Sequence, residues 1–451
     1  MADGVERIVE KLLARHRRDA VLLHRFYPPS AAPRTNSKFG GLPRLPDSHD
    51  WPRTADGVPL HFLAQIDCAD VPFRTQLPPA GVLFFFGRDD AGQHWPRDRP
   101  ASEYCRVLYA ADASALTPAR PAPADLPGIG GRYPRPNARP FLRDGEEGPN
   151  VHVEWPIEPL RFATWPDVSA LGDTIATPFF DWSRLHPKRL FESTAEALLR
   201  RADEQDAIIE AYEDALASLR AAEYYRATKV VSPPSEAWSG HSMTEALTLY
   251  GKDGTPGAFP AHWAHLDFFC RAALAKISRN AGALEEAPDA ASIAARWIER
   301  AEAKPASDPV SDADRAEFRA WVASLRSPDS VAPLNRYASE WIIEATMAVV
   351  RLFAGDPVRA ALIPAETYAL LAPPLLGYAN GGPDFSKMLG HAPSAQDASP
   401  VDDPTLCLLN LDSDGGVGWM FGDVGYCSFW IAPADLARRD FSRVWATIQG
   451  H

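Results

Sequence analysis

The sequence predicts an α+β protein: an extended, mainly antiparallel β-sheet body formed by both chain ends, with an α-helical insertion in the middle. Short apolar runs bounded by glycine and proline fill both ends, which is typical of buried strands. The middle instead carries long segments with apolar residues at helical spacing. We expect a β-rich first part over residues 1–185, a helical insertion over 186–360, and a β-rich third part over 361–451 that completes the same body.

The first part opens with apolar residues at helical spacing from Val5 to Leu13, which predicts an amphipathic helix facing the core. Residues 81–89 and 104–110 are apolar runs between turn signals, and they predict two buried strands. Residues 116–140 are rich in proline and glycine. This stretch is either a linker or a long ordered surface loop.

The middle part predicts a series of helices with recognisable N-caps. The expected caps are Ser193 or Thr194, Asp289, Ser311 and Asn335. Short polar breaks between the helices favour antiparallel packing. The predicted helices cover residues 193–223, 261–280, 289–303, 311–327 and 335–355.

The third part returns to strands, predicted over residues 404–414, 419–423 and 425–432. Pro433 suits the first turn of a helix, which we expect to run over residues 433–449.

The two ends of the chain resemble each other. At one offset Gln65 aligns with Asn410, Asp67 with Asp412, and Phe84 with Phe429. Either two copies of a hairpin pack together, or strand composition has converged. Each run is too short and apolar to be stable alone, so we expect both runs in the same or facing sheets.

The composition of the chain limits the classes of binding partner and compartment that are expected. The net charge of −13 argues against nucleic acid or an anionic membrane as the main partner. No apolar run reaches the length of a membrane span, and the opening residues lack a secretory apolar region. Five cysteines without a CxxC pair predict free thiols and a cytoplasmic protein. High proline and alanine contents favour a bacterial origin. The expected partner is an unknown protein or a small molecule.

The stretch from Leu411 to Gly425 admits two interpretations. Asp412, Asp414 and Asp423 stand at positions 1, 3 and 12 of a calcium-loop pattern, but the glycine and the bidentate glutamate of that pattern are missing. The favoured interpretation is a turn between strands, supported by the glycines after Asp414.

Two other motifs are weighed in the same way. Lys38 beside Gly40 and Gly41 suggests an anion site, but the phosphate-loop pattern is absent, so a tight loop with a solvated lysine is favoured. His262 and His265 share a helix face, yet no third metal ligand is evident, which favours a structural role. We therefore expect no metal, no cofactor and no catalytic constellation.

Two ordered strings of motifs carry a family resemblance. The segment "SKFGGLPRLPDSHDWPRTADGVPLHFLAQIDCADVP" and the later "TLCLLNLDSDGGVGWMFGDVGYCSFWIAPADLARRDFSRV" resemble the bacterial YwqG-like family of domains of unknown function. The resemblance covers roughly the first 110 and the last 80 residues. It implies an α+β fold with an extended antiparallel sheet, and no established reaction.

Two departures from the family pattern concern residues near the turn at Gly377. Pro373 and Pro374 stand where the family has a histidine, and Ala379 replaces a proline. Asn410 also stands where glutamine is usual. A site built on that histidine is therefore not expected here, and the helical middle looks like an insertion.

Two hypotheses of function follow. The first is a non-enzymatic binding or protein-interaction module, with a toxin-immunity or accessory role by analogy. The second is a small-molecule binder or hydrolase with its site between the sheet body and the helical insertion. A broad exposed apolar patch favours the first, and a pocket with convergent polar groups favours the second. The candidate ligand or partner residues are Lys38, Gly40, Gly41, Gln65, Asn410, Asp412, Asp414, Trp419 and Asp423.

Overall fold

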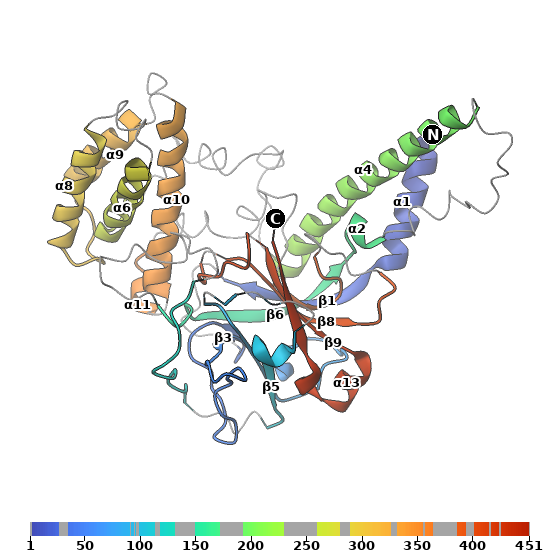
Figure 1. Ribbon diagram of the computed structural model, residues 1–451. Helices are drawn as coiled ribbons and strands as arrows, with labels where there is room; N and C mark the ends of the chain where they lie inside the picture. Colours follow the sequence, from blue (N-terminus) through green and yellow to red (C-terminus); the bar gives the residue numbers. More distant parts are fainter. Residues whose placement is uncertain are drawn as a thin grey trace.

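A computed structural model of the chain places its elements around one β-sheet (Figure 1). The structure describes residues 2–26, 35–90, 92–93, 95, 99–112, 118–130, 149–171, 193–229, 259–279, 289–325, 332–354, 357–363, 386–393, 401–414, 416–423 and 425–450.

The strands and helices of these residues have the following bounds. The strands are β1 (Arg18–Arg25), β2 (Lys38–Phe39), β3 (His61–Asp67), β4 (Val82–Gly87), β5 (Cys105–Ala110), β6 (Trp155–Thr164), β7 (Lys387–Leu389), β8 (Leu406–Asp412), β9 (Tyr426–Ile431) and β10 (Trp445–Gln449). The helices are α1 (Ala2–His16), α2 (Val168–Leu171), α4 (Ser193–Thr228), α6 (Trp263–Arg279), α8 (Ala290–Glu302), α9 (Asp312–Leu325), α10 (Ala332–Ala354), α11 (Pro357–Ala360) and α13 (Pro433–Arg438).

The ten strands form a single antiparallel sheet in the order β10-β9-β8-β7-β1-β6-β2-β3-β4-β5. The α+β prediction is therefore confirmed, and so is the expectation that the two similar runs share a sheet. The edge strands β5 and β10 contact each other, so the sheet curls until it is nearly closed. This brings segments from both ends of the chain around one core.

The sheet has an internal two-fold arrangement. Strands β7 to β10 extend from β1 as β2 to β5 extend from β6, and β1 pairs with β6 at the centre. Lys38 faces Gln65 in one half, and Lys387 faces Asn410 in the other. Each half also has a β-bulge, between Phe62 and Ala64 in β3 and between Cys407 and Leu409 in β8. The resemblance between the two ends thus reflects equivalent positions.

The predicted alignment of Phe84 with Phe429 is wrong by one residue. Gln65 faces Phe84 whereas Asn410 faces Ser428, so the counterpart of Phe429 is Phe85. Because neighbouring strand residues point to opposite faces, this shift decides which side chains share the core. Phe85 and Phe429 contact each other with ring centroids 5.3 Å apart.

Two groups of helices flank the sheet (Figure 1). Helix α1 packs on α4, which lies against β6, and Val9, Leu13 and Tyr212 are buried between them. The predicted core-facing helix at the start of the chain is therefore confirmed. Helices α6, α8, α9 and α10 form a separate bundle on the other side. Helix α4, expected within the insertion, belongs with the sheet.

Most predicted helices start within two residues of their expected positions. Ser311 caps α9, because its Oγ accepts a hydrogen bond from the N–H of Asp314 at 3.1 Å. Asn335 does not cap α10, which begins at Ala332. Pro333 there takes the first turn, where a proline needs no donor.

Two predictions for the third part are wrong. Residues 419–423 are not a strand, since Gly418 and Gly422 adopt positive φ and only Trp419 makes a bridge, to Asp414. The predicted helix over 433–449 ends at Arg438, because Arg439 takes a left-handed conformation. The remainder forms a 3-10 turn over Phe441–Arg443 and then β10, which pairs with β9.

Three further features are clear in the described part of the chain. None of its helices is both long enough and apolar enough to cross a membrane. The five cysteines are buried thiols. His265 is also buried, and its Nδ1 accepts a hydrogen bond from the N–H of His262 at 3.2 Å, at the start of α6.

Candidate functional site

The glycine pair near Lys38 holds a neighbouring segment in place. Gly40 donates its N–H to Leu63 O, and Gly41 donates to His152 O at 2.9 Å. A Cβ on Gly40 would lie 2.1 Å from Val153 O, so only glycine allows this approach. The backbone amides are therefore used within the protein, which does not favour the anion-site interpretation.

Lys38 is buried, which corrects the expectation of a solvated lysine. Its Nζ donates to Leu42 O and to Glu154 Oε2, both at 2.7 Å. Because the Lys38 side chain is buried, its charge needs a partner, and the half-exposed Glu154 supplies it. Burial lowers the pKa of Lys38, and Glu154 opposes this shift.

Gln65 and Asn410 are both fully buried in equivalent strands. Gln65 accepts from the N–H of Arg44 and donates to Asn36 O at 2.9 Å. Asn410 Oδ1 accepts from Ser428 Oγ at 2.8 Å. Gln65 thus bonds to two segments outside the strands, whereas Nδ2 of Asn410 has no hydrogen-bond partner among the described residues.

The aspartate-rich stretch forms the connection between β8 and β9, as the turn interpretation predicts. Asp414 Oδ1 accepts from the N–H groups of Gly416 and Val417, and its other oxygen pairs with Arg25. Asp412 ends β8, and Asp423 is exposed in a second turn. The three aspartates therefore do not converge, and in the described residues no group of three His, Cys, Asp or Glu side chains could hold a metal ion.

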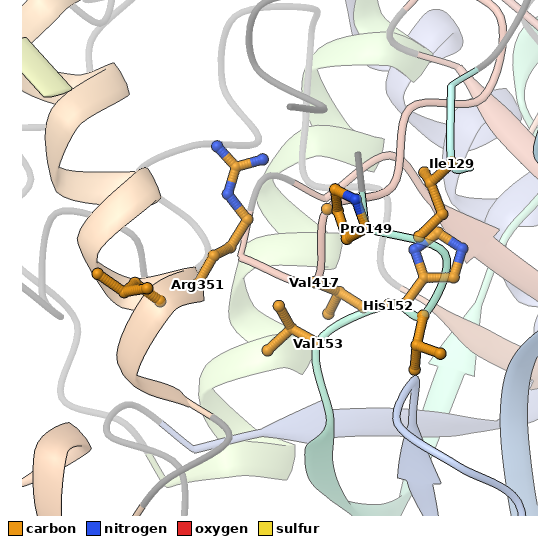
Figure 2. A pocket seen from close by; sticks show the side chains of 9 residues that line it. Ile129, Pro149, His152, Val153, Arg351 and Val417 are labelled. Carbon is orange, nitrogen blue, oxygen red and sulfur yellow. The ribbon is translucent and has the colours of Figure 1, made fainter. Parts of the chain in front are cut away.

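A pocket lies where the sheet body meets α10. It has a volume of about 230 Å³. Figure 2 shows Arg351 extending from α10, with Pro149, Val153 and Val417 between it and His152 on the sheet side. The wall of the pocket is mainly apolar, with His152 and Arg351 as its ionisable members. The lining residues are Ile129, Pro149, Val151, His152, Val153, Arg351, Leu352, Val417 and Gly418.

The sheet-side wall is fixed by backbone hydrogen bonds. Val153 donates its N–H to Val417 O at 3.3 Å, and Ile129 donates to Pro149 O at 2.8 Å. Gly418 has φ +90°, and a Cβ there would lie 3.8 Å from Cδ of Arg351. The turn that resembles a calcium loop thus serves as one wall of the pocket.

His152 and Asp89 form a buried pair behind this wall. Nε2 of His152 lies 3.2 Å from Oδ2 of Asp89, and both side chains are almost inaccessible to solvent. The contact is electrostatic, because its geometry falls short of a hydrogen bond. The His152 ring also packs edge-on against Trp419 at 6.1 Å, which places one sequence-predicted residue beside the pocket.

Asp89 is held in place by Gln93 and His61. Gln93 Nε2 donates to Asp89 Oδ1 at 2.5 Å and to Met420 O at 3.0 Å. His61 Nδ1 accepts from the N–H of Asp89, and burial lowers the pKa of His61, which keeps its ring neutral. The carboxylate of Asp89 is therefore held in one orientation by its neighbours.

Arg351 brings a cation into the apolar pocket. Protein surrounds most of its side chain although solvent reaches it through the opening. Burial lowers the pKa of Arg351 to about 10, and Glu344 opposes the shift. The guanidinium stays protonated at neutral pH, so the site favours an anion.

Sequence reasoning missed the residues that carry this site. His152 stands between two valines before β6, Asp89 follows β4, and Arg351 lies near the end of a helix. No fixed spacing links them, so no short motif could have found them. An isolated histidine between apolar residues was the one available signal.

The fold and pocket define a class: an α+β protein with a two-fold antiparallel sheet and a small open pocket at its helical flank. The chain belongs to the family described as a domain of unknown function (DUF1963), whose model matches residues 37–234 and 276–450. A search of curated proteins finds no match.

Proposed function

We propose that the protein binds a small organic anion in the pocket between the sheet body and α10. The guanidinium of Arg351 in an apolar wall carries this proposal. A cation in such surroundings attracts a carboxylate more strongly than one in water does.

The size of the pocket points to a small ligand. A volume of about 230 Å³ lies below the range of roughly 300–1,000 Å³ that is usual for drug-sized molecules. The apolar wall formed by Ile129, Val153 and Val417 suits a short hydrocarbon part. A short-chain carboxylate combines both properties.

The protein-interaction hypothesis has less support. The large hydrophobic side chains exposed in the described part of the chain are Phe26, Leu352 and Leu362, and Leu352 itself lines the pocket. They do not amount to the broad apolar patch that a partner protein would need.

Calorimetry with propionate and butyrate tests the proposal. Both should bind, and Arg351→Leu should weaken binding at least about 10-fold, because a charge-assisted hydrogen bond is lost. Arg296→Leu is the matched control, since Arg296 is exposed on α8, outside the pocket. Equal affinities in the wild type and in Arg351→Leu would contradict the proposal.

We also infer that the protein is of the YwqG-like type and works in a reducing bacterial cytoplasm. Five buried thiols support the compartment, and burial raises the pKa of Cys68, Cys105 and Cys407 to about 12. Titration of the unfolded, unreduced protein should find five free thiols.

A further inference from the structure

We propose that the preferred ligand is a medium-chain monocarboxylate: its carboxylate faces Arg351, and its hydrocarbon chain passes over Leu352 into a second pocket on α6 and α8. This inference rests on the anion-binding function proposed above and extends it, because the short-chain acids occupy the first pocket alone.

The second pocket lies where α10 meets α6 and the end of α8. It has a volume of about 90 Å³. Its floor is apolar and consists of Trp263, Ala264, Phe268 and Ala301. Figure 1 shows α10 between the helical bundle and the sheet, so the two pockets lie on either side of α10.

Leu352 forms the border between the two pockets. Its side chain lines both of them and is 43% exposed, whereas Val350 and Phe353 on the same helix are fully buried. A leucine exposed between two recesses leaves hydrocarbon surface in water. A ligand chain that covers Leu352 removes this surface from water, which favours binding.

The chain has an accessible path between the pockets. On the sheet side Pro149 is exposed, and Val151 and Val153 are half-buried, so their side chains offer surface to a ligand. Arg351 directly precedes Leu352 on α10, where the rise per residue is about 1.5 Å. A carboxylate bound at Arg351 therefore brings its first methylene groups within reach of Leu352.

The far end of the ligand chain gains little from a second charged group. Arg271 donates to Asp267 and to Glu302, both at 2.8 Å, so the two acids that line the second pocket already have a cationic partner. They therefore attract an ammonium group only weakly. Lys304 lines the same pocket but is exposed, and an exposed ion pair contributes little to binding.

Calorimetry with butyrate, hexanoate and octanoate tests the chain length. The wild type should bind octanoate at least about 10-fold more tightly than butyrate, because each partly buried methylene group adds roughly 2-fold. Leu352→Ala should lower this ratio to about 3-fold or less, and Leu352→Met should keep it, since methionine retains the hydrocarbon contact. Leu362→Ala is the matched control, because Leu362 is 50% exposed and lines neither pocket.

Two further measurements separate the carboxylate from the chain. Arg351→Leu should weaken octanoate binding at least about 10-fold, which distinguishes a chain anchored at Arg351 from one adsorbed on apolar surface. Suberate has the octanoate chain length with a carboxylate at each end. It should bind more weakly than octanoate, because its second carboxylate must leave water beside Leu352.

The outcomes separate the two proposals. Equal binding of butyrate and octanoate, or a ratio that Leu352→Ala leaves unchanged, overturns the chain-length inference and leaves anion binding intact. Tighter binding of suberate than of octanoate also overturns it. If none of the monocarboxylates binds, or if Arg351→Leu binds octanoate as tightly as the wild type does, the anion-binding function itself fails.

Discussion

The two halves of the sheet share a scaffold and differ in what their loops carry. Ser37 Oγ accepts from the N–H of Asp67 at 3.0 Å, and Ser386 Oγ accepts from Asp412 at 3.1 Å, beside the equivalent lysines. Only the first half, however, supplies His61, Asp89 and Gln93. The second half contributes a wall through residues 417–418. The repeated strands thus provide stability, and the unrepeated loops provide the site.

The largest expected effect concerns Phe85 and Phe429, which are equivalent core residues of the two halves of the sheet. Phe85→Ala and Phe429→Ala should each destabilise the protein by about 3–5 kcal/mol, because both side chains are fully buried. Since the two rings touch, the double variant should lose about 0.5–1.5 kcal/mol less than the sum. Urea unfolding measures all three.

Phe84→Ala provides the control for this cycle. Phe84 lies in a different buried cluster, with Phe62 and Phe86. Its effect should add to that of Phe429→Ala within about 0.5 kcal/mol. Strong coupling of Phe84 to Phe429 would favour the register that the sequence alignment suggested.

The second prediction concerns the centre of the two-fold arrangement, where His24 faces Glu158. Burial lowers the pKa of His24 to about 4, whereas the unfolded chain titrates at 6.5. The unfolded state therefore binds the proton more readily, so stability is full above pH 6.5 and falls as the pH drops towards 4. The loss attributable to His24 should reach about 3 kcal/mol.

His24→Phe should remove this part of the acid sensitivity. Phenylalanine keeps the ring contacts with Phe26 and Tyr224 but cannot be protonated. Denaturant unfolding at pH 7.5, 6, 5 and 4.5 compares the slopes. An unchanged slope would mean that His24 is accessible to protons in the folded state.

The third prediction uses two glycines with positive φ. Gly40→Ala forces a Cβ against Val153 O, whereas a Cβ on Gly57 meets no described atom within 4 Å. Gly57→Ala should cost about 1 kcal/mol from backbone strain alone, and Gly40→Ala about 2 kcal/mol more. Because the strained segment carries His152, Gly40→Ala should also weaken ligand binding. Equal melting temperatures for Gly40→Ala and Gly57→Ala would contradict the predicted difference in stability.

The smallest effect is expected at Lys38. Glu154→Gln leaves the lysine with a weaker partner and should cost about 1 kcal/mol, a low figure because Glu154 is half-exposed. Lys38→Met in the same background should recover this loss. A further loss in the double variant would show that the lysine has another role in the sheet.

The sequence predicts elements well where a periodic pattern is long. The observed bounds of helices α6, α8 and α9 agree with the predicted ones, because apolar residues recur there at helical spacing over more than three turns. Strand β6 was missed because Pro156 and Pro159 argue against a central strand. Pro159 is accommodated because β2 pairs only with Trp155 and Pro156. Pro156 is accommodated because the pairing of β6 with β1 begins one residue later, at Ile157.

The site was less predictable than the fold. His152, Asp89 and Arg351 come from two loops and a helix, and only tertiary packing brings the first two together at 3.2 Å. Among the predicted residues, Trp419 packs against the His152 ring and Gly41 bonds to the His152 carbonyl. The glycines of residues 40–41 were noticed for anion binding, yet their role is to position the segment that carries His152.

The central position of β1 has a consequence for biosynthesis. One edge of β1 pairs with β6 and the other with β7, and residues 165–386 separate those partners in the chain. At roughly 5–20 residues per second the ribosome needs about 10–45 s to make that stretch. During this time β1 exposes an unpaired edge, which can capture strands of other nascent chains. Ribosome-bound chains that stop before β7 should therefore associate with chaperones more than chains that extend through β9.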